Sequence, residues 1–365
     1  VVPLVIVSLV AGTCSLGDPK KLGRVGVKAL LFYLVTTCIA ITLAIVLANI
    51  IDPGDISDIP DEYKQQPTIG PSQGLVETLL QMIPDNPIAS FTKGAMLQII
   101  VFSILFGTCV TLIGEKGKPL VSLINATNDV VMKMVWIIMV IAPYGIAALL
   151  AKTFATLGFE AIFALGKYMI TVLLALFIHM TLVYTGMLKL FARLSVIQFF
   201  KNIIPAQTVA FSTASSSATL PITIETVEKR MGASNSIASF VLPLGATINM
   251  DGTAIMQGVA VVFIAQISGV DLTMANYLTV ILAATLASIG TAGIPGVGLI
   301  MLSMVLDSVG LDAKHIAMIF GIDRILDMCR TTTNITGDAV CTLVIAKSEK
   351  ELNTDIYYEK NVPVK

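Results

Sequence analysis

Residues 320 to 346 read FGIDRILDMCRTTTNITGDAVCTLVIA, an apolar helical stretch that carries a regular series of charged and amide side chains. At about 100° per residue, Asp323, Asp327, Arg330, Asn334 and Asp338 fall within an arc of about 100° on one helix face. An ionised side chain in the middle of a membrane costs on the order of 3 kcal/mol unless it is paired or hydrated. The stretch therefore predicts a helix whose single polar stripe lines a binding site.

The rest of the chain has the composition of a membrane protein. Of the 365 residues, 55% are hydrophobic and 13% are charged, and the mean hydropathy is +0.87. Soluble domains carry about twice that share of charged residues. We therefore expect an all-α polytopic protein of the cell membrane, with the lipid bilayer as its surroundings. The net charge of -1, without a basic cluster, indicates no nucleic-acid partner.

The positions of basic residues predict how the apolar segments are oriented, because short cytoplasmic loops carry an excess of Lys and Arg. The segment 202–224 lies between two basic groups, at Lys201 and Lys229, so it should enter and leave on the cytoplasmic side. No Lys or Arg occurs from 231 to 313. The segment 277–306 should then return to its own side from the opposite face. The sequence thus predicts two re-entrant helical hairpins of inverted topology.

The centres of these two segments contain helix breakers. The first reads STASSSATLP at 212–221, and the second reads SIGTAGIPGVG at 288–298. Non-helical backbone at membrane depth is found where it is buried in protein or lines a cavity, and paired interrupted segments mark transporter binding sites. The alternative is that each cluster of small residues only allows close helix packing.

A third interruption is predicted between the hairpins, where residues 242–254 read LPLGATINMDGTA. Asn249 and Asp251 would lie near mid-membrane, and the glycines indicate a locally unwound helix. Exposed carbonyl groups beside a carboxylate form an oxygen-only cage, which suits a hard cation such as Na+.

The polar stripe offers chemistry for a zwitterionic anion. It provides a carboxylate for an ammonium group, a guanidinium that can bind a carboxylate through a bidentate fork, and further oxygens for cations. Asp327 and Arg330 could instead simply neutralise each other, but that alternative leaves Asn334 and Asp338 unexplained. Arg324 lies at the edge of the stripe. The inventory predicts an acidic amino acid that travels with Na+.

At this point the chain resembles the dicarboxylate/amino acid:cation symporters, the family that includes the glutamate transporters of animals and archaea. The resemblance rests on GRVGVKALLFYLVTT, SSSATLP, LPLGATINMDGTA, LASIGTAGIPG and DRILDMCRTTTNITGD. It implies Na+-coupled symport of L-aspartate or L-glutamate by a homotrimer with an elevator mechanism. It also implies the glutamate-transporter fold, with one family helix expected before residue 1.

The resemblance also implies a division into domains. A scaffold and trimerisation domain would comprise 1–24 and 94–165, and a transport domain would comprise 25–51 and 166–350. Residues 52–93 would form an extracellular loop and the start of the next helix. The second hairpin would act as the extracellular gate.

Carried over by position, Asp327 would bind the substrate's amino group and Arg330 its side-chain carboxylate. The remaining substrate positions implied by the resemblance are Ala214, Ser215, Ser216, Thr253, Ile294, Gly298, Thr331 and Asn334. Some prokaryotic members of the family carry an arginine where Ala214 stands, and animal members carry it where Met328 stands. Arg324 is the nearest candidate for that role here.

The resemblance implies three Na+ sites. The first would use Gly245, Asn249, Asn334 and Asp338. The second would use Thr247, Ser288, Ile289 and Thr291. The third would use Tyr33, Thr36, Thr37, Asn249 and Asp251.

Other functions stay open at this stage. A proton-coupled glutamate or aspartate symporter would share most of the stripe. A C4-dicarboxylate transporter would have no ammonium group for Asp327, and a neutral amino acid transporter would not need Arg330. An anion channel would not need inverted hairpins. We do not expect an enzyme, because His179 and His315 have no evident nucleophile beside them, and His179 is interpreted as a helix-face residue.

Overall fold

The computed structural model describes residues 22–54, 83–93, 96–131, 160–290 and 295–359 apart from a few positions within them, together with Gly293 and scattered residues before 15 and between 133 and 144. These described parts are helical and contain a single isolated bridge, between Ala233 and Leu352, and no strand. The expectation of an all-α chain is confirmed for them.

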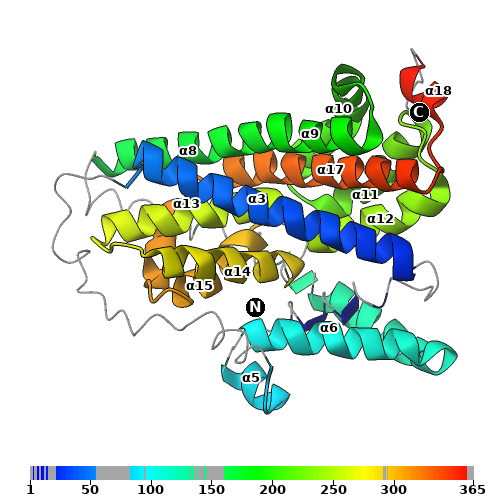
Figure 1. The fold of residues 1–365 in the computed structure, drawn as a ribbon. Coiled ribbons are helices and arrows are strands. Elements are labelled where there is room, and N and C mark those ends of the chain that lie inside the picture. The colour runs from blue at the N-terminus through cyan, green and yellow to red at the C-terminus, as the bar shows by residue number, and fades with distance from the viewer. Residues whose placement is uncertain are drawn as a thin grey trace.

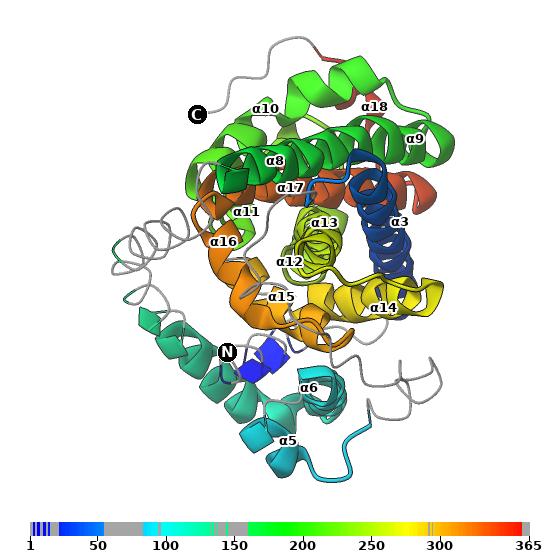
Figure 2. The ribbon, with the colours of Figure 1, turned by 90° about the vertical axis from the view of Figure 1, so that its left-hand side faces the viewer.

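Helix α13 (Asp251–Ile267) lies at the centre of the molecule, as the end-on view of Figure 2 shows. Every residue of α13 except Gln266 is buried. The surrounding helices that contact it are α3 (Val27–Ile51), α8 (Glu160–Ile178), α14 (Met274–Gly290), α15 (Val297–Asp307) and α17 (Asp323–Ser348). Gly258 allows α3 to approach, since a Cβ there would lie 3.0 Å from the Cβ of Ala44. A helix that is covered on all sides is expected to be mainly apolar around its whole circumference.

The described chain also forms two helical hairpins, of which the first packs against α12 (Asn235–Ile248) and α17 and the second against α13. In the first, α10 (Val196–Thr213) turns into α11 (Ser216–Lys229) at Ala214, which has a left-handed φ of 51°. The Ser215 side chain then caps α11 by accepting from the Ala218 N–H. The second hairpin consists of α14 and α15, with Gly296 at φ +79° just before α15. Both segments are thus interrupted at the predicted helix breakers.

The predicted unwinding between the hairpins is also present. Helix α12 (Asn235–Ile248) ends before Asn249, and α13 begins two residues later. Asn249 and Met250 have ψ angles of 97° and 44°, so neither continues the helix. The break exposes the carboxyl end of α12 and the amino end of α13 to the same place, where their unpaired carbonyl and N–H groups can bind other partners.

The remaining helices complete the body in chain order. Before α3 comes η1 (Leu22–Gly26), and α8 continues as η3 (His179–Tyr184), α9 (Thr185–Met187) and η4 (Leu188–Ala192). The short helices η5 (Ala313–His315) and α16 (Ile316–Phe320) precede α17, and α18 (Thr354–Tyr358) follows it. In Figure 1 both α3 and α17 cross the body, and α3 packs far more extensively against α13 than against α17.

At the edge of the body lie α5 (Pro87–Lys93) and α6 (Met96–Leu112), as Figure 1 shows. The short helix η2 (Gly114–Gly117) follows α6 in the chain. Residues 118–131 are also helical. Val110 of α6 shares a small apolar cluster with Val10 and Cys14, apart from the two large clusters of the main body. Much of the predicted scaffold domain and residues 55–82 of the predicted loop lie outside the described residues.

Three helical stretches in the described part of the chain are long and apolar enough to cross a membrane. They are Arg24–Ile51, Leu165–Ala192 and Asn235–Ile267, with 28, 28 and 33 residues. In the third, 94% of an apolar 18-residue window is buried within the protein, which agrees with its central position.

Candidate functional site

The stripe on α17 is buried and faces the hairpins and the break between α12 and α13. Its polar members, Asp323, Asp327, Arg330, Thr331, Asn334 and Asp338, are all buried. Ile325, between two of them in sequence, is 57% exposed. The prediction of a single polar face directed inward is confirmed for this part of the helix. Arg324, at the predicted edge of the stripe, is exposed rather than directed into the site.

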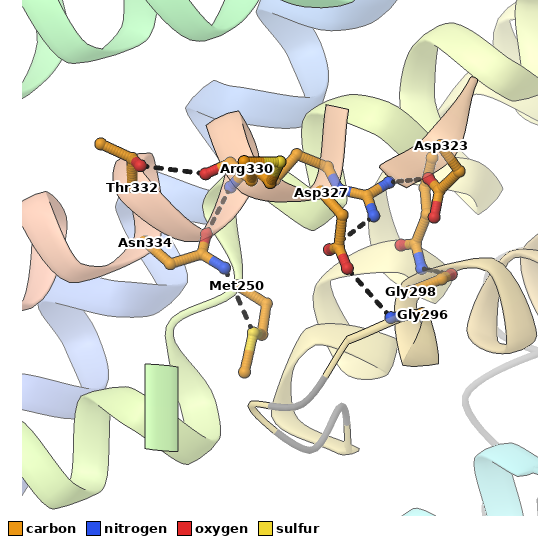
Figure 3. A network of polar contacts seen from close by, with 11 residues as sticks. Met250, Gly296, Gly298, Asp323, Asp327, Arg330, Thr332 and Asn334 are labelled. Atoms are coloured by element: carbon orange, nitrogen blue, oxygen red, sulfur yellow. Dashed lines mark hydrogen bonds and ion pairs between the residues drawn. The ribbon is translucent and has the colours of Figure 1, made fainter. Parts of the chain in front are cut away.

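Arg330 has no exposed surface and is bound by two carboxylates of its own helix. Its Nη1 lies 2.7 Å from Asp323 Oδ1, and its Nη2 lies 2.7 Å from Asp327 Oδ1. Figure 3 shows the guanidinium pointing between the two aspartates. The partners stand seven and three residues before Arg330, two turns and one turn away on the same face. A buried guanidinium of this kind needs such charged partners to offset its desolvation.

Asp327 also contacts the second hairpin. Its Oδ2 accepts a hydrogen bond from the backbone N–H of Gly296 at 3.0 Å, just before α15 (Figure 3). A carboxylate is favoured at this position because a helix amino terminus carries partial positive charge. Gly298, the second residue of α15, packs against Thr253 of α13, and a Cβ there would lie 2.8 Å from Thr253 Cγ2. The predicted positions Asp327, Thr253 and Gly298 therefore gather at one place.

Asn334 connects the stripe to the start of α13. Its Oδ1 accepts from the Gly252 N–H at 2.8 Å, and its Nδ2 lies 3.4 Å from Met250 Sδ. Gly252 permits this contact, since a Cβ there would lie 2.6 Å from the carbonyl oxygen of Arg330. The break between α12 and α13 is thus packed directly against the middle of α17.

Next to this contact, several oxygen atoms meet around Asn249. The Asn249 Nδ2 donates to Asp338 Oδ1 at 2.8 Å and to the Asn334 carbonyl oxygen at 3.0 Å. The Asn249 Oδ1 is buried and has no hydrogen-bond partner among the described residues. A Cβ at Gly245 would overlap Asp338 Oδ1 and would lie 2.6 Å from the Tyr33 hydroxyl. The structure therefore brings together the residues predicted for the first cation site.

The carboxylate of Asp251 lies in a second buried polar cluster. Its Oδ1 accepts from the Thr37 hydroxyl at 2.5 Å. Its Oδ2 accepts from the Tyr184 hydroxyl at 2.8 Å and lies 3.1 Å from His179 Nε2. All four side chains are almost completely buried. Thr37 and Asp251 were both predicted for one cation site, whereas His179 and Tyr184 were not.

The interpretation of His179 as only a helix-face residue is wrong, and the reason is local geometry. His179 and Tyr184 stand five residues apart, a spacing that points two side chains in different directions on an α-helix. Residues His179–Tyr184 form a π-helix, in which i and i+5 are linked. Their rings accordingly lie 4.6 Å apart and share the Asp251 carboxylate. The visible signal was a polar pair within the apolar run ALFIHMTLVY.

The two hairpin tips touch each other near the stripe. The Ser215 hydroxyl donates to the Gly293 carbonyl oxygen at 2.7 Å, and the Ser217 N–H donates to the same oxygen at 3.2 Å. Ala214 and Ser216 are buried beside this contact. In this arrangement the Ser215 hydroxyl is already engaged by the opposite tip.

The remaining predicted residues are placed as follows. Thr36, whose hydroxyl donates to the Tyr33 carbonyl oxygen, is buried on α3. The hydroxyls of Thr247 and Ser288 donate to carbonyl groups of their own helices, α12 and α14, which contact each other. Thr291 and Ile294, together with the side chain of Ile289, lie outside the described residues.

Comparisons with known proteins agree with this geometry. The sequence profile of the sodium:dicarboxylate symporter family matches residues 1–348. The chain is 39% identical over 374 residues to the proton/glutamate-aspartate symporter of Escherichia coli (strain K12), covering 99% of this chain and 85% of that protein. It is 36% identical over 363 residues to the proton/sodium-glutamate symport protein of Geobacillus stearothermophilus, covering 97% and 86%. To excitatory amino acid transporter 3 of Mus musculus it is 34% identical over 415 residues, covering 99% and 79%.

Proposed function

The chain belongs to the sodium:dicarboxylate symporter family of integral membrane transporters, and we propose that it is a symporter that couples the uptake of L-aspartate or L-glutamate to Na+. The observation that carries this proposal is the position of Arg330. This buried cation lies on the same helix face as Asp327, Asn334 and Asp338. One face thus offers groups for an ammonium, a carboxylate and a cation.

The substrate would bind with its ammonium group on Asp327 and its side-chain carboxylate on Arg330. Asp327 has acceptor sites left, because an ionised carboxylate provides about four lone-pair positions and the structure uses one oxygen for Arg330 and the other for Gly296. Arg330 likewise keeps donors, since its Nε is without a partner among the described residues. Backbone groups of both hairpin tips, with Thr253, Thr331 and Asn334, would complete the pocket.

Na+ would bind beside the substrate, at the oxygen cluster of Asn249 and Asp338. A buried amide oxygen without a hydrogen-bond donor, as Asn249 Oδ1 is in the described part of the chain, is an available ligand for a hard cation. The Asp251 cluster with Thr37 supports a further cation position. The Thr247, Ser288, Ile289 and Thr291 set belongs to the proposal by resemblance alone.

Transport would proceed by alternating access. The two hairpins would be re-entrant and of inverted topology, and opening of the second tip away from Ser215 would admit substrate from outside. A homotrimeric scaffold formed by 1–24 and 94–165 would stay fixed, while the domain of 25–51 and 166–350 moves as an elevator. The close packing of α3, α13, α14 and α17 supports a single moving body.

Proton coupling is the second candidate. Two of the relatives described above are named for protons, one of them for both protons and sodium. The Asp251 carboxylate already accepts from Thr37 and Tyr184 and lies within hydrogen-bond distance of His179, so its charge is stabilised by protein groups alone. The Asp251 carboxylate therefore does not need a bound metal ion, which is what a proton-coupled symporter requires of this place.

The deciding experiment is uptake of labelled L-aspartate and L-glutamate into proteoliposomes. An inward Na+ gradient is compared with an inward proton gradient in Na+-free buffer. We expect uptake with the Na+ gradient only. Uptake driven by the proton gradient alone would show that the coupling ion is H+ and not Na+. If neither gradient drove uptake of either amino acid, the proposed substrate class would be refuted.

A further inference from the structure

Asp323 binds the same guanidinium as Asp327 but was not predicted as a substrate residue. Its Oδ1 lies 2.7 Å from Arg330 Nη1, and its side chain is only 7% exposed. The Asp327 side chain is 11% exposed, and Arg330 is completely buried. Two carboxylates and one guanidinium give this cluster a net charge of -1.

Asp327 has a second partner that Asp323 does not share. Besides Arg330 it accepts from the Gly296 N–H of the second hairpin, and in the proposed function it must also accept the substrate's ammonium group. If Arg330 depended on Asp327 alone, every shift of Asp327 toward a ligand would leave a buried cation without compensation, which is strongly unfavourable. A second carboxylate on Arg330 removes that conflict.

We infer that Asp323 is a positioning residue that sets the preference for ligands with an ammonium group. By neutralising Arg330 from the Nη1 side, it leaves Asp327 available to an ammonium, and it keeps the cluster negative so that a dianion without an ammonium is repelled. This inference rests on the proposed function and deepens it. It assigns selectivity between amino acids and plain dicarboxylates to a residue that does not itself touch the substrate.

Removal of the Asp323 charge has a directional consequence. In Asp323→Asn the cluster of Asp327 and Arg330 becomes neutral, and Asp327 is drawn more strongly to Arg330. An ammonium is then attracted less, and a dianion is repelled less. The apparent affinities for L-aspartate and succinate should therefore change in opposite directions.

The test uses the full-length chain in proteoliposomes, with unlabelled L-aspartate or succinate competing against labelled L-aspartate under the gradient that drives the wild type. We expect the concentration of L-aspartate for half-inhibition to rise about tenfold in Asp323→Asn, while that of succinate falls. Asp271→Asn is the matched control, because it removes the same charge from an exposed loop position, and it should leave both values unchanged.

If Asp323→Asn gives too little uptake to measure, the same comparison is made as ligand-induced shifts of the melting temperature of purified protein, with Asp323→Glu included to restore the carboxylate. A larger succinate shift and a smaller aspartate shift in Asp323→Asn, reversed in Asp323→Glu, supports the inference. Loss of both ligands in equal proportion, or succinate binding no better than in wild type, overturns it. Failure of the proposed function is distinct, because the wild type itself would then take up no acidic amino acid.

Discussion

The Ser215 hydroxyl donates to the Gly293 carbonyl oxygen across 78 positions of sequence, so that the tip of one hairpin is bonded to the tip of the other. The same hydroxyl oxygen accepts from the Ala218 N–H and caps α11. One side chain therefore stabilises both a helix start and the contact between tips. This double role leads to the first prediction.

Ser215→Ala should loosen the second tip. Loss of an N-cap costs about 0.5 to 2 kcal/mol, and the tip contact disappears with it. We expect faster amide hydrogen exchange in the parts of α14 and α15 that flank Gly293, measured by mass spectrometry without substrate. Ser195→Ala is the control, because Ser195 caps α10 in the same way but lies at the other end of that helix. Exchange that rises equally in both variants would contradict a specific tip contact.

Arg330→Cys should abolish acidic amino acid transport. The substitution leaves Asp323 and Asp327 as two buried carboxylates without their cation, and breaking a buried pair costs about 3 to 5 kcal/mol. Labelled L-aspartate uptake should vanish, while uptake of labelled L-serine or L-alanine appears or persists. Arg324→Cys, an exposed arginine of the same helix, should transport L-aspartate normally. Unchanged aspartate affinity in Arg330→Cys would refute the assigned role.

Asp338→Asn should weaken cation binding more than it weakens the fold. Asp338 is 2% exposed and accepts from Asn249, an amide that can donate equally well to the new side chain's oxygen. The lost charge should raise the Na+ concentration for half-maximal aspartate binding at least about tenfold, which corresponds to about 1.4 kcal/mol. The thermal midpoint measured in parallel without Na+ should change little. Equal losses in both measurements would indicate a purely structural carboxylate.

His179→Ala should destabilise the protein through Asp251. The buried Oδ2 would lose its contact with the His179 Nε2, a cost of about 1 to 3 kcal/mol. We expect a lower thermal midpoint and weaker Na+-dependent stabilisation. His179→Gln offers a side-chain N–H at a similar reach and should recover most of both effects. If His179→Gln were as impaired as His179→Ala, a hydrogen bond to Asp251 would not explain the role of His179.

The contact between the start of α3 and the end of α17 should depend on pH. Glu349 accepts from Lys28 Nζ at 2.6 Å and from Arg24, and the hydrogen bond from Lys28 lowers the pKa of Glu349. A carboxyl group whose folded pKa is lowered stabilises the protein above its unfolded pKa, about 4.3, and loses that contribution as the pH falls through the folded value. The melting temperature of the wild type should thus fall more steeply below about pH 4.3 than that of Glu349→Gln. Glu115→Gln is the control, because Glu115 forms only an exposed ion pair with Lys118. Its melting temperature should change with pH as that of the wild type does.

The sequence predicted the features that follow from periodicity and helix breakers. The inward stripe of α17, the break at Asn249 and Met250, and the interruptions at Ala214 and before Val297 all depend on local residue type. The sequence also placed Asp323 on the stripe. Its hydrogen bond with Arg330, two helical turns away, depends on the rotamers of both side chains, which the sequence does not determine. The His179 and Tyr184 pair was missed because it depends on a π-helix, and no simple pattern of apolar residues distinguishes that from an α-helix. The contact between Ser215 and Gly293 depends on how two hairpins dock, which only tertiary packing determines.

The interruption between α12 and α13 has a consequence for how the two cargoes depend on each other. On one side of the interruption, the Asn249 amide donates to the Asp338 carboxylate. On the other side, the Gly252 N–H donates to Asn334, one turn after Arg330 on α17. A cation at the first place and an anionic amino acid at the second would each immobilise the same two-residue joint. Whichever arrived first would meet most of the entropic penalty of ordering it, and the later arrival would be bound more tightly for that reason. Cooperation between the proposed ion and amino acid would then be a thermodynamic property of one shared hinge, and it would need no direct contact between them.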